Sequence, residues 1–447
     1  MVICMQIKLP DKVSYIIEKL EAAGYEAYAV GGCVRDSLLG RVPDDWDITT
    51  SANPYEVKEI FPRTIDTGIQ HGTVTVMMDR EGFEVTTYRI DGEYEDSRHP
   101  KEVIFTRNLE EDLKRRDFTI NAMAYNDRSG IVDIFGGMDD LQNKIIRCVG
   151  EARERFTEDA LRIMRAVRFS AQLGYDIDEN TKKAIIELAP NLKNISAERI
   201  QVELVKLLVS PNPDFIRIAY DLGITAVILP EFDKAMKTEQ NNPHHMYTVG
   251  EHLIHCVKNI RADKALRIAA LLHDIGKPDT KTTDEDGVDH FYGHVELSEE
   301  MAAKILRRLK FDNDTITKVR KYIRFHDYQI VSTPKAVRRA MNKIGVEYFA
   351  QVMEIKQADM RAQSGYQREE KEAKWQQVQE LYQERLLKAE CVTIKDLAIN
   401  GTDLIRLGVA QGKEIGEVLN RLLQEVLDAP EKNTVEYLTA LVENYRK

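Results

Sequence analysis

The chain has 447 residues, of which 43% are hydrophobic and 31% charged, so it is long enough for two to four globular domains. Its formal net charge of −11 excludes a uniformly basic surface that would coat nucleic acid, although a local basic patch still suits phosphates. The five scattered cysteines form no C-x-x-C motif and no apolar run approaches about 18 residues, which indicates a reducing cytoplasm and no membrane role.

The first predicted elements lead to a pair of glycines. Apolar residues recur at helical spacing over residues 5–23, and the apolar run over residues 27–30 predicts a strand. Gly31 and Gly32 follow this strand and precede a short predicted helix over residues 34–39. Glycines at the start of a helix allow a close backbone approach, and the free N–H groups there favour an anion such as phosphate.

Two acidic residues come next. Asp45 and Asp47 flank Trp46 on a predicted second strand that ends at Ile48. Because side chains alternate along a strand, both carboxylates are expected on one face, where their repulsion favours a bound cation. Such oxygen ligands suit Mg²⁺, which takes one or two carboxylates together with substrate phosphates. The alternative is a solvated acidic turn, but the glycines upstream favour a site for a nucleotide and a metal.

Further elements of the first third follow from local pattern. Residues 54–61 are predicted to form a helix, and residues 71–78 and 83–88 a strand pair. Glu84 on the second of these strands is either a third active-site carboxylate or a surface acid. The polar run over residues 89–108 is predicted to form a mobile loop.

Three basic residues, 114–116, precede Asp117 and the start of a predicted apolar helix within residues 110–124. Arginine forks in this position suit triphosphate oxygens, and a charged helix flank is the alternative.

A second dense stretch, residues 151–175, is predicted to be one helix. Asp159, Arg162 and Arg165 lie along one stripe of it, and Arg168 extends the stripe. The stripe is either an ion-paired surface or a row of groups that reads a base edge. In the second case the aspartate accepts from an amino group and the arginine donates to a ring nitrogen or carbonyl.

Residues 25–210 resemble the class II tRNA nucleotidyltransferases, the family of the CCA-adding enzymes and the related bacterial poly(A) polymerases. The motifs that carry the resemblance are GGCVRDSLLG with DDWDIT, HGTVTV with EVTTYR, RRDFTINAMA, TEDALRIMRAVRF and ISAERIQVELVKLL. The resemblance implies a mainly helical α+β protein with a polymerase-β-type nucleotidyltransferase head and an all-α neck. It also implies template-independent addition of CCA to the 3′ end of tRNA from CTP and ATP.

The resemblance also implies roles for single residues. Asp45 and Asp47 would hold two Mg²⁺ ions, with Glu84 as the further active-site carboxylate. The tRNA 3′-hydroxyl then attacks the α-phosphate of the nucleotide, and pyrophosphate leaves. Asp159 and Arg162 would read the base of CTP or ATP. The implied nucleotide-binding residues are Gly32, Arg35, Arg116, Asp159, Arg162, Arg165 and Arg168.

The chain changes character at about residue 243, where histidines become frequent. The motif LLHDIG, together with histidines on flanking segments and a later aspartate, resembles the HD metal-dependent phosphohydrolases over residues 243–365. The ion is open between Mn²⁺, iron, Ni²⁺ and Mg²⁺. The alternative is a helical body that only holds tRNA. The resemblance implies metal ligands at His252, His273, Asp274 and Asp359, with His294 and His326 available to a second ion.

We therefore expect four parts: a catalytic head (1–147), a neck for base recognition and RNA binding (148–242), an HD domain (243–365) and a helical tail that binds tRNA (366–447). The expected partners are tRNA, CTP and ATP, without DNA. The net charge of −11 disfavours a poly(A) polymerase, and the filled carboxylate positions disfavour a non-catalytic RNA scaffold. An enzyme that adds only the terminal A and an HD phosphohydrolase with a vestigial head both stay open, as does the oligomeric state.

Overall fold

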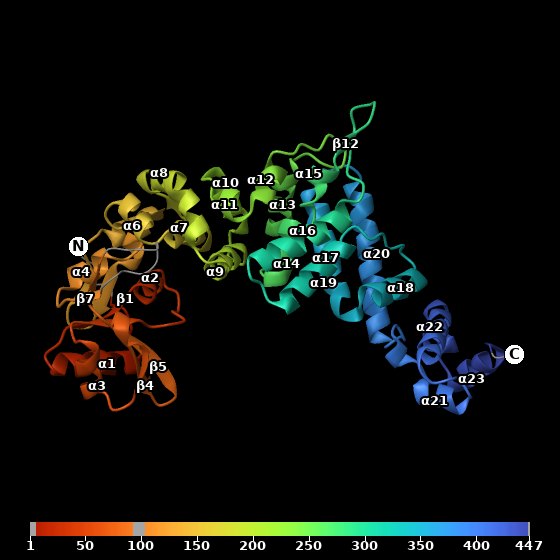
Figure 1. Cartoon of the computed structure of the whole chain (residues 1–447), viewed down its shortest axis with the longest axis horizontal. Helices are drawn as coiled ribbons and strands as arrows, with labels where there is room; N and C mark the ends of the chain where they lie inside the picture. Colours follow the sequence, from red (N-terminus) through yellow and green to blue (C-terminus); the bar gives the residue numbers. More distant parts are fainter. Residues whose placement is uncertain (1–5, 93–102, 446–447) are drawn as a thin grey trace. The chain divides into compact units, whose positions relative to one another are not determined.

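The computed structural model describes residues 6–92 and 103–445, which divide into two compact units, Met1–Pro230 and Glu231–Lys447. Figure 1 follows the chain from α1 (Asp11–Ala22) in the first unit to α23 (Val435–Tyr445) in the second. The four-part division expected from the sequence stays a prediction.

The first unit is built on a seven-stranded sheet with the strand order β3-β4-β5-β2-β1-β8-β9. In this sheet β2 and β5 run parallel, and the other neighbouring strands are antiparallel. The strands are β1 (Ala27–Val30), β2 (Ile48–Thr50), β3 (Thr64–Gly68), β4 (Thr73–Met78), β5 (Glu81–Thr87), β8 (Met123–Asn126) and β9 (Gly130–Asp133). The helices beside them are α1, α2 (Gly32–Leu38), α3 (Pro54–Ile60), α4 (Leu109–Lys114) and α5 (Gly137–Asn143).

Several elements were predicted from local pattern. The strand over residues 27–30 is confirmed as β1, and the predicted strand pair is confirmed as the antiparallel pair of β4 and β5. The predicted helix over residues 54–61 is confirmed as α3, which begins after Asn53, whose side chain accepts from two backbone N–H groups. The first helix begins later than predicted, because Pro10 precedes its first turn at Asp11.

Two predictions for the first unit were wrong. Strand β2 begins at Ile48 rather than ending there, so Asp45 and Asp47 come just before the strand. The run after Asp117 forms a short 3₁₀ turn, Thr119–Asn121, and then strand β8 instead of a helix. β8 lies between β1 and β9 and is buried on both faces, which removes the alternation typical of a strand.

The polar run over residues 89–108 is also more ordered at its ends than predicted. Its ends pair as the antiparallel strands β6 (Arg89–Asp91) and β7 (Val103–Phe105). The middle of the predicted mobile loop, residues 93–102, lies outside the described residues.

Apart from the short parallel pair β10 (Ile145–Ile146) and β11 (Asp176–Ile177), the rest of the first unit is helical, but the predicted helix over residues 151–175 is broken. It forms α6 (Ala152–Glu158) and α7 (Leu161–Leu173), and Asp159 between them has an extended backbone with φ −141° and ψ 102°. The apolar face of α7 is buried at Leu161, Met164 and Val167. The helices that follow are α8 (Glu179–Leu188), α9 (Ala197–Leu208), α10 (Ile216–Asp221) and α11 (Thr225–Ile228).

The second unit is almost entirely helical. Together with the sheet and helices of the first unit, it confirms the predicted mainly helical α+β fold. The charged run over residues 367–390 contains a long helix, α20 (Arg368–Leu387). Among the described residues, no helix is both long and apolar enough to cross a membrane. The other helices are α12 (Pro230–Met236), α13 (Val249–Lys258), α14 (Lys264–Leu272), α15 (Lys277–Thr280), α16 (His294–Arg308), α17 (Asn313–Phe325), α18 (Pro334–Ile344), α19 (Val346–Ala362), α21 (Gly401–Arg406) and α22 (Lys413–Asp428).

Candidate active site and candidate metal centre

Carboxylates gather where β2 and its parallel neighbour β5 lie side by side. The register pairs Ile48 with Val85, so Asp47 and Glu84 occupy equivalent places one residue earlier. A backbone N–H of β1 donates to the Asp47 carbonyl at 3.0 Å and fixes this end of the segment. Between described residues, no hydrogen bond or ion pair occupies the carboxylate of Asp45, Asp47 or Glu84. These groups are therefore available to a cation.

Arg116 lies beside this group of carboxylates. The pKa of the Asp47 carboxyl is raised, because partial burial and the charge of Asp45 outweigh the opposing charge of Arg116. Gly31 lies against the same guanidinium: its φ is +84°, and a Cβ there would lie 3.1 Å from Arg116 Nη1. Gly32, which the sequence predicted as the nucleotide contact, has no such constraint on its backbone. The glycine that this turn requires is therefore Gly31.

Three of the predicted nucleotide-binding arginines surround one aromatic ring. The guanidinium carbons of Arg35, Arg165 and Arg168 lie 5.0, 5.3 and 3.7 Å from the centre of the Phe169 ring. Such cation–π contacts favour a fixed position for each charge. The sequence analysis missed Phe169, and its place next to Arg168 was the available signal.

A buried polar chain holds two of these arginines. Arg35 donates to Asn121 Oδ1 at 2.6 Å, and Asn121 in turn donates to Asp117 at 3.1 Å. Asp117 Oδ2 accepts from Arg165 Nε at 2.7 Å. Burial alone would raise the pKa of Asp117, but the charge of Arg165 and these hydrogen bonds lower it to about 2. Asp117 therefore stays ionised and joins α2 to α7.

Arg168 lies deeper than the predicted stripe implies. It is 6% exposed and pairs with Glu203 of α9 at 2.6 Å. Burial lowers the pKa of the Arg168 guanidinium to about 10, although the charge of Glu203 opposes that change. Glu203 was not predicted from the sequence.

The two predicted base-reading residues are each held by a neighbour. Asp159 accepts from the backbone N–H of Leu161 at 3.0 Å and from Arg199 Nη2 at 2.7 Å. Arg162 donates to Glu158 at 2.6 Å. Asp159 lies outside α7, so the pair sits at the junction of two helices and not along a single helical stripe.

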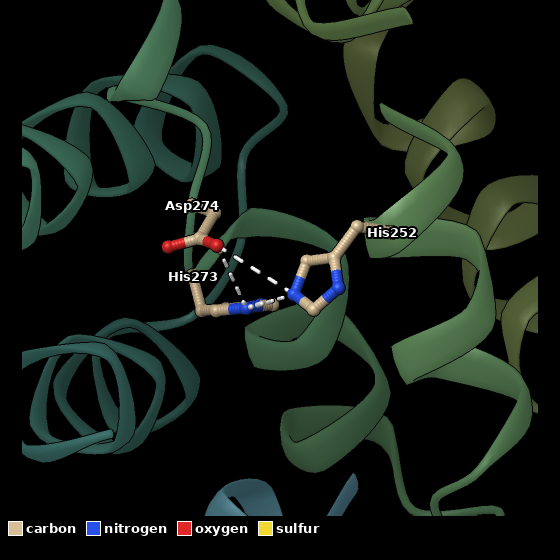
Figure 2. A group of neighbouring side chains, drawn as sticks. All are labelled: His252, His273 and Asp274. Atoms are coloured by element: carbon tan, nitrogen blue, oxygen red, sulfur yellow. Dashed lines mark hydrogen bonds and ion pairs between the residues drawn. The ribbon is translucent and has the colours of Figure 1, made fainter. Parts of the chain in front are cut away.

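In the second unit, the histidine and aspartate side chains that the HD resemblance singled out come together. Figure 2 shows the imidazoles of His252, on α13, and His273, at the end of α14, facing the carboxylate of Asp274. His252 Nε2 lies 3.2 Å from His273 Nε2 and 3.0 Å from Asp359 Oδ1. The structure thus brings together these ligands from separate helices.

Asp274 is shared between two groups of ligand atoms. Its carboxylate belongs to one group with His252 and His273 and to a second with His294 and His326. His294 Nε2 and His326 Nε2 lie 3.4 and 3.5 Å from Asp274 Oδ1. The side chains named from the sequence therefore fit two neighbouring cation positions.

Backbone carbonyls fix the orientation of the imidazoles. The Nδ1 atoms of His273, His294 and His326 lie 2.9, 2.7 and 2.7 Å from carbonyl oxygens. A carbonyl only accepts, so each Nδ1 carries a proton, and in the neutral imidazole each Nε2 turns a lone pair toward the cluster.

Lone pairs that face one another repel unless a proton or a metal ion lies between them. Asp274 Oδ1 is buried and has no hydrogen-bond donor within the described chain. Burial lowers the pKa of His273, but Asp274 and Asp359 outweigh this and raise it to about 10. The cluster thus favours a positive charge at its centre, and its nitrogen and oxygen donors fit a divalent ion.

A cavity of about 540 Å³ opens beside this cluster, and we call it the HD pocket. Asp274, His294, His326 and Asp359 line one part of it. Other walls carry Lys277, which follows the HD motif directly and was noted with it from the sequence, and Lys356, Lys371, Lys374 and Trp375, which were not predicted for this site.

Comparisons with known proteins cover both units. Three family models match the chain: the poly A polymerase head domain over residues 27–147, the RNA- and SrmB-binding site of polymerase A over 174–236, and tRNA nucleotidyltransferase domain 2 over 280–442. A CCA-adding enzyme of Lactobacillus helveticus is 36% identical over 450 residues, which cover 98% of each chain. A CCA-adding enzyme of Leuconostoc mesenteroides is 56% identical over 193 residues. The matched stretch covers 43% of this chain and 48%, about half, of the relative.

Solved structures agree with these matches. The CCA-adding enzyme of Bacillus stearothermophilus, determined in complex with CTP, is 32% identical, with a TM-score of 0.73 and coverage of 98% of both chains. The Thermotoga maritima CCA-adding enzyme, determined with tRNA, has a TM-score of 0.62 over 99% of this chain and 98% of its own. It is 21% identical, so this second likeness supports the fold alone.

Proposed function

The chain belongs to the family of CCA-adding enzymes, and we propose that it builds the CCA end of tRNA from CTP and ATP without a nucleic-acid template. It is a nucleotidyltransferase with the polymerase head domain. Among the structural features, the group of unpaired carboxylates beside Gly31 and Arg116 carries this proposal. Because relatives aligned over the full chain are CCA-adding enzymes, complete CCA addition is favoured over addition of A alone.

Asp45 and Asp47 are proposed to hold Mg²⁺ with Glu84 beside them, and the ions would acidify the attacking hydroxyl and neutralise the leaving pyrophosphate. The 3′-oxygen of tRNA forms a bond to the α-phosphorus while the bond from that phosphorus to the β-phosphate oxygen breaks. Gly31 has no side chain, so its backbone can lie close to the Arg116 guanidinium. This leaves room for a triphosphate next to that guanidinium.

Base selection is proposed to rest on Asp159 and Arg162. Cytosine and adenine both present an amino group next to a ring nitrogen, so one acceptor and one donor serve both bases. Arg199 and Glu158 keep the two side chains in place before a nucleotide arrives. Further nucleotide contacts are proposed at Gly32, Arg35, Arg116, Arg165 and Arg168.

The direct test offers tRNA transcripts that end before C, after C and after CC, each with CTP or ATP. We expect two C additions with CTP and one A addition to the CC-ending transcript with ATP. Asp45→Ala is expected to abolish all three additions while tRNA affinity is kept. Extension of the CC-ending transcript alone, and only by ATP, would instead identify an enzyme that adds the terminal A.

We propose a metal-dependent phosphohydrolase as a second function, because two groups of metal-binding atoms share Asp274 at the wall of the HD pocket. A bound divalent ion would supply a water of lowered pKa and charge for the phosphate. In the reaction, a water oxygen forms a bond to phosphorus, the ester P–O bond breaks, and the alcohol leaves with a proton. Calorimetric titration with Mn²⁺ tests the site, and binding that Asp274→Ala leaves unchanged would exclude it.

Two further proposals concern the cellular location of the protein and the division of the chain into functional parts. We propose the cytoplasm as the location, where thiols stay reduced, because the cysteines within the described residues are unpaired. We propose that residues 1–147 carry catalysis, 148–242 base recognition, 243–365 the HD centre and 366–447 part of the tRNA contact. Deletion of residues 366–447 is expected to raise the Kd for tRNA more than the KM for ATP.

A further inference from the structure

Asp112 is a buried carboxylate that has no role in the reaction proposed above. It lies on α4, is 0% exposed, and precedes Arg115 and Arg116 by one helical turn. Leu109 and Leu113 of the same helix pack into the apolar core. Burial of a carboxylate is costly unless it is paired, so an acid among apolar neighbours calls for an explanation.

The two oxygens of Asp112 each accept from an arginine. Oδ1 accepts from Arg115 Nε at 3.0 Å, and Oδ2 accepts from Arg116 Nη2 at 3.3 Å. Burial alone would raise the pKa of the Asp112 carboxyl, but the charges of Arg115 and Arg116 lower it. Asp112 therefore stays ionised at neutral pH and holds both guanidinium groups.

The strands that carry the proposed catalytic acids also hold Asp112. Thr49 lies on β2, two residues after Asp47, and it pairs in register with Thr86 on β5, two residues after Glu84. The Thr49 hydroxyl lies 3.2 Å from Asp112 Oδ2 and 3.2 Å from the Thr86 carbonyl. The position of Asp112 is thus fixed by the same two strands that position the acids.

Arg116 lies between Asp112 and the proposed cation site. Its charge acts on Asp47, but among the described residues its one ion pair is with Asp112. Its Nη1 atom lies toward Gly31, where a Cβ would be 3.1 Å away. A guanidinium that could turn freely would pair with Asp47 and occupy an oxygen that a cation needs. The contact with Asp112 opposes that movement.

We propose that Asp112 is a positioning residue for nucleotidyl transfer. It holds Arg116 by one edge, so that the other edge is kept for a triphosphate oxygen and Asp47 is kept for the cation. An apolar side chain could fill the same buried space, but it could not fix the direction of an arginine. The inference rests on the nucleotide site proposed above, to which it adds a residue that acts through Arg116.

The test measures CTP binding in the absence of tRNA, so that no transfer takes place. In the full-length Trp375→Phe variant, Trp46 is the sole tryptophan, and it lies between Asp45 and Asp47 in the sequence. Its emission gives the Kd for CTP, and the KM for CTP and kcat of addition to tRNA are measured in parallel.

Three variants and one control are compared in this background. The variants are Asp112→Asn, Arg116→Ala and the two changes combined. The control is Asn108→Ala, which removes the exposed cap of α4, whose side chain accepts from the Glu110 N–H at 2.9 Å. The control weakens the same helix without removing a contact of Arg116, and circular dichroism shows which variants fold.

We expect Asp112→Asn and Arg116→Ala each to raise the Kd and KM for CTP by about tenfold, with the Kd for tRNA unchanged. The combined variant should match Arg116→Ala, because Asp112 acts through that guanidinium. Asn108→Ala should leave the Kd for CTP unchanged. An unchanged Kd in Asp112→Asn, or effects that add in the combined variant, would overturn the inference.

A second variant covers the case in which Asp112→Asn does not fold. Thr49→Val keeps the shape of a buried side chain and removes the hydroxyl beside Asp112 Oδ2. It should raise the Kd for CTP about threefold, and an unchanged value would equally overturn the inference. CTP addition that survives Asp45→Ala would instead refute the nucleotide site itself.

Discussion

Asp117 offers the sharpest test of the polar chain that positions the arginines. Replacement by Asn keeps the shape of the side chain and removes the charge that faces Arg165 at 2.7 Å. The pKa of Asp117 falls from 3.8 to about 2 on folding, which corresponds to about 2 kcal/mol of stability at neutral pH. Asp117→Asn should therefore lower the free energy of unfolding of the first unit by about that amount.

The pH dependence has a definite sign. A carboxyl with a depressed folded pKa contributes its full stability above the unfolded value of 3.8 and loses it as the pH falls toward 2. The difference between the parent and Asp117→Asn should stay constant from neutral pH to about pH 5 and fall to roughly half by about pH 3.

The assay needs a probe in the first unit, because a chain of two compact units need not unfold in one step. Trp375→Phe leaves Trp46, which lies in that unit, as the only tryptophan, and its emission is followed during urea unfolding. Asp176→Asn, at an exposed aspartate nearby, serves as the control. A difference that stays equal at pH 7 and pH 3 would refute the role given to the charge of Asp117.

Three further predictions concern the two sites. Gly31→Ala should abolish nucleotide addition, because the φ of this residue is +84° and the new methyl group would meet Arg116. The control is Gly40→Ala, at φ +69° in open space, which should lower the stability by about 1 kcal/mol and keep activity. Glu84→Gln should lower kcat by about a hundredfold with tRNA affinity unchanged, and a rise in the Kd for tRNA alone would contradict its place at the reaction. Asp274→Ala should remove the part of the Mn²⁺ binding, measured by calorimetry, that belongs to the HD pocket, and should leave CCA addition intact. Loss of CCA addition together with that binding would argue against separate centres.

The sequence was most informative where a local pattern determines the structure. The pair of β4 and β5 alternates apolar and polar residues and was predicted. The HD cluster was also found from sequence, since His273 and Asp274 form a rare adjacent pair at a helix end. Their geometry, including the shared carboxylate of Asp274, came only from the packing of helices far apart in the chain.

The errors have physical causes of a different kind. The segment after Asp117 is apolar without alternation, because β8 is covered on both faces, and such a run does not separate a strand from a helix. No proline or glycine marks the helix break at Asp159 in the sequence. The carboxylate of Asp159 pairs with Arg199, which lies forty positions away in the chain. The wall that α20 contributes to the HD pocket likewise depends on tertiary packing that spacing along one helix does not reveal.

The ring of Phe169 has a consequence for the energetics of catalysis. It holds three guanidinium groups within 5.3 Å of its centre before any nucleotide is present, and Asp117, Asn121 and Glu203 lock their orientations. Long arginine side chains lose much rotational freedom when they are immobilised, and here folding has already imposed that entropic cost. An incoming triphosphate, which we propose these arginines contact, would therefore meet preorganised guanidinium donors, and more of its binding energy would be left to favour the transition state.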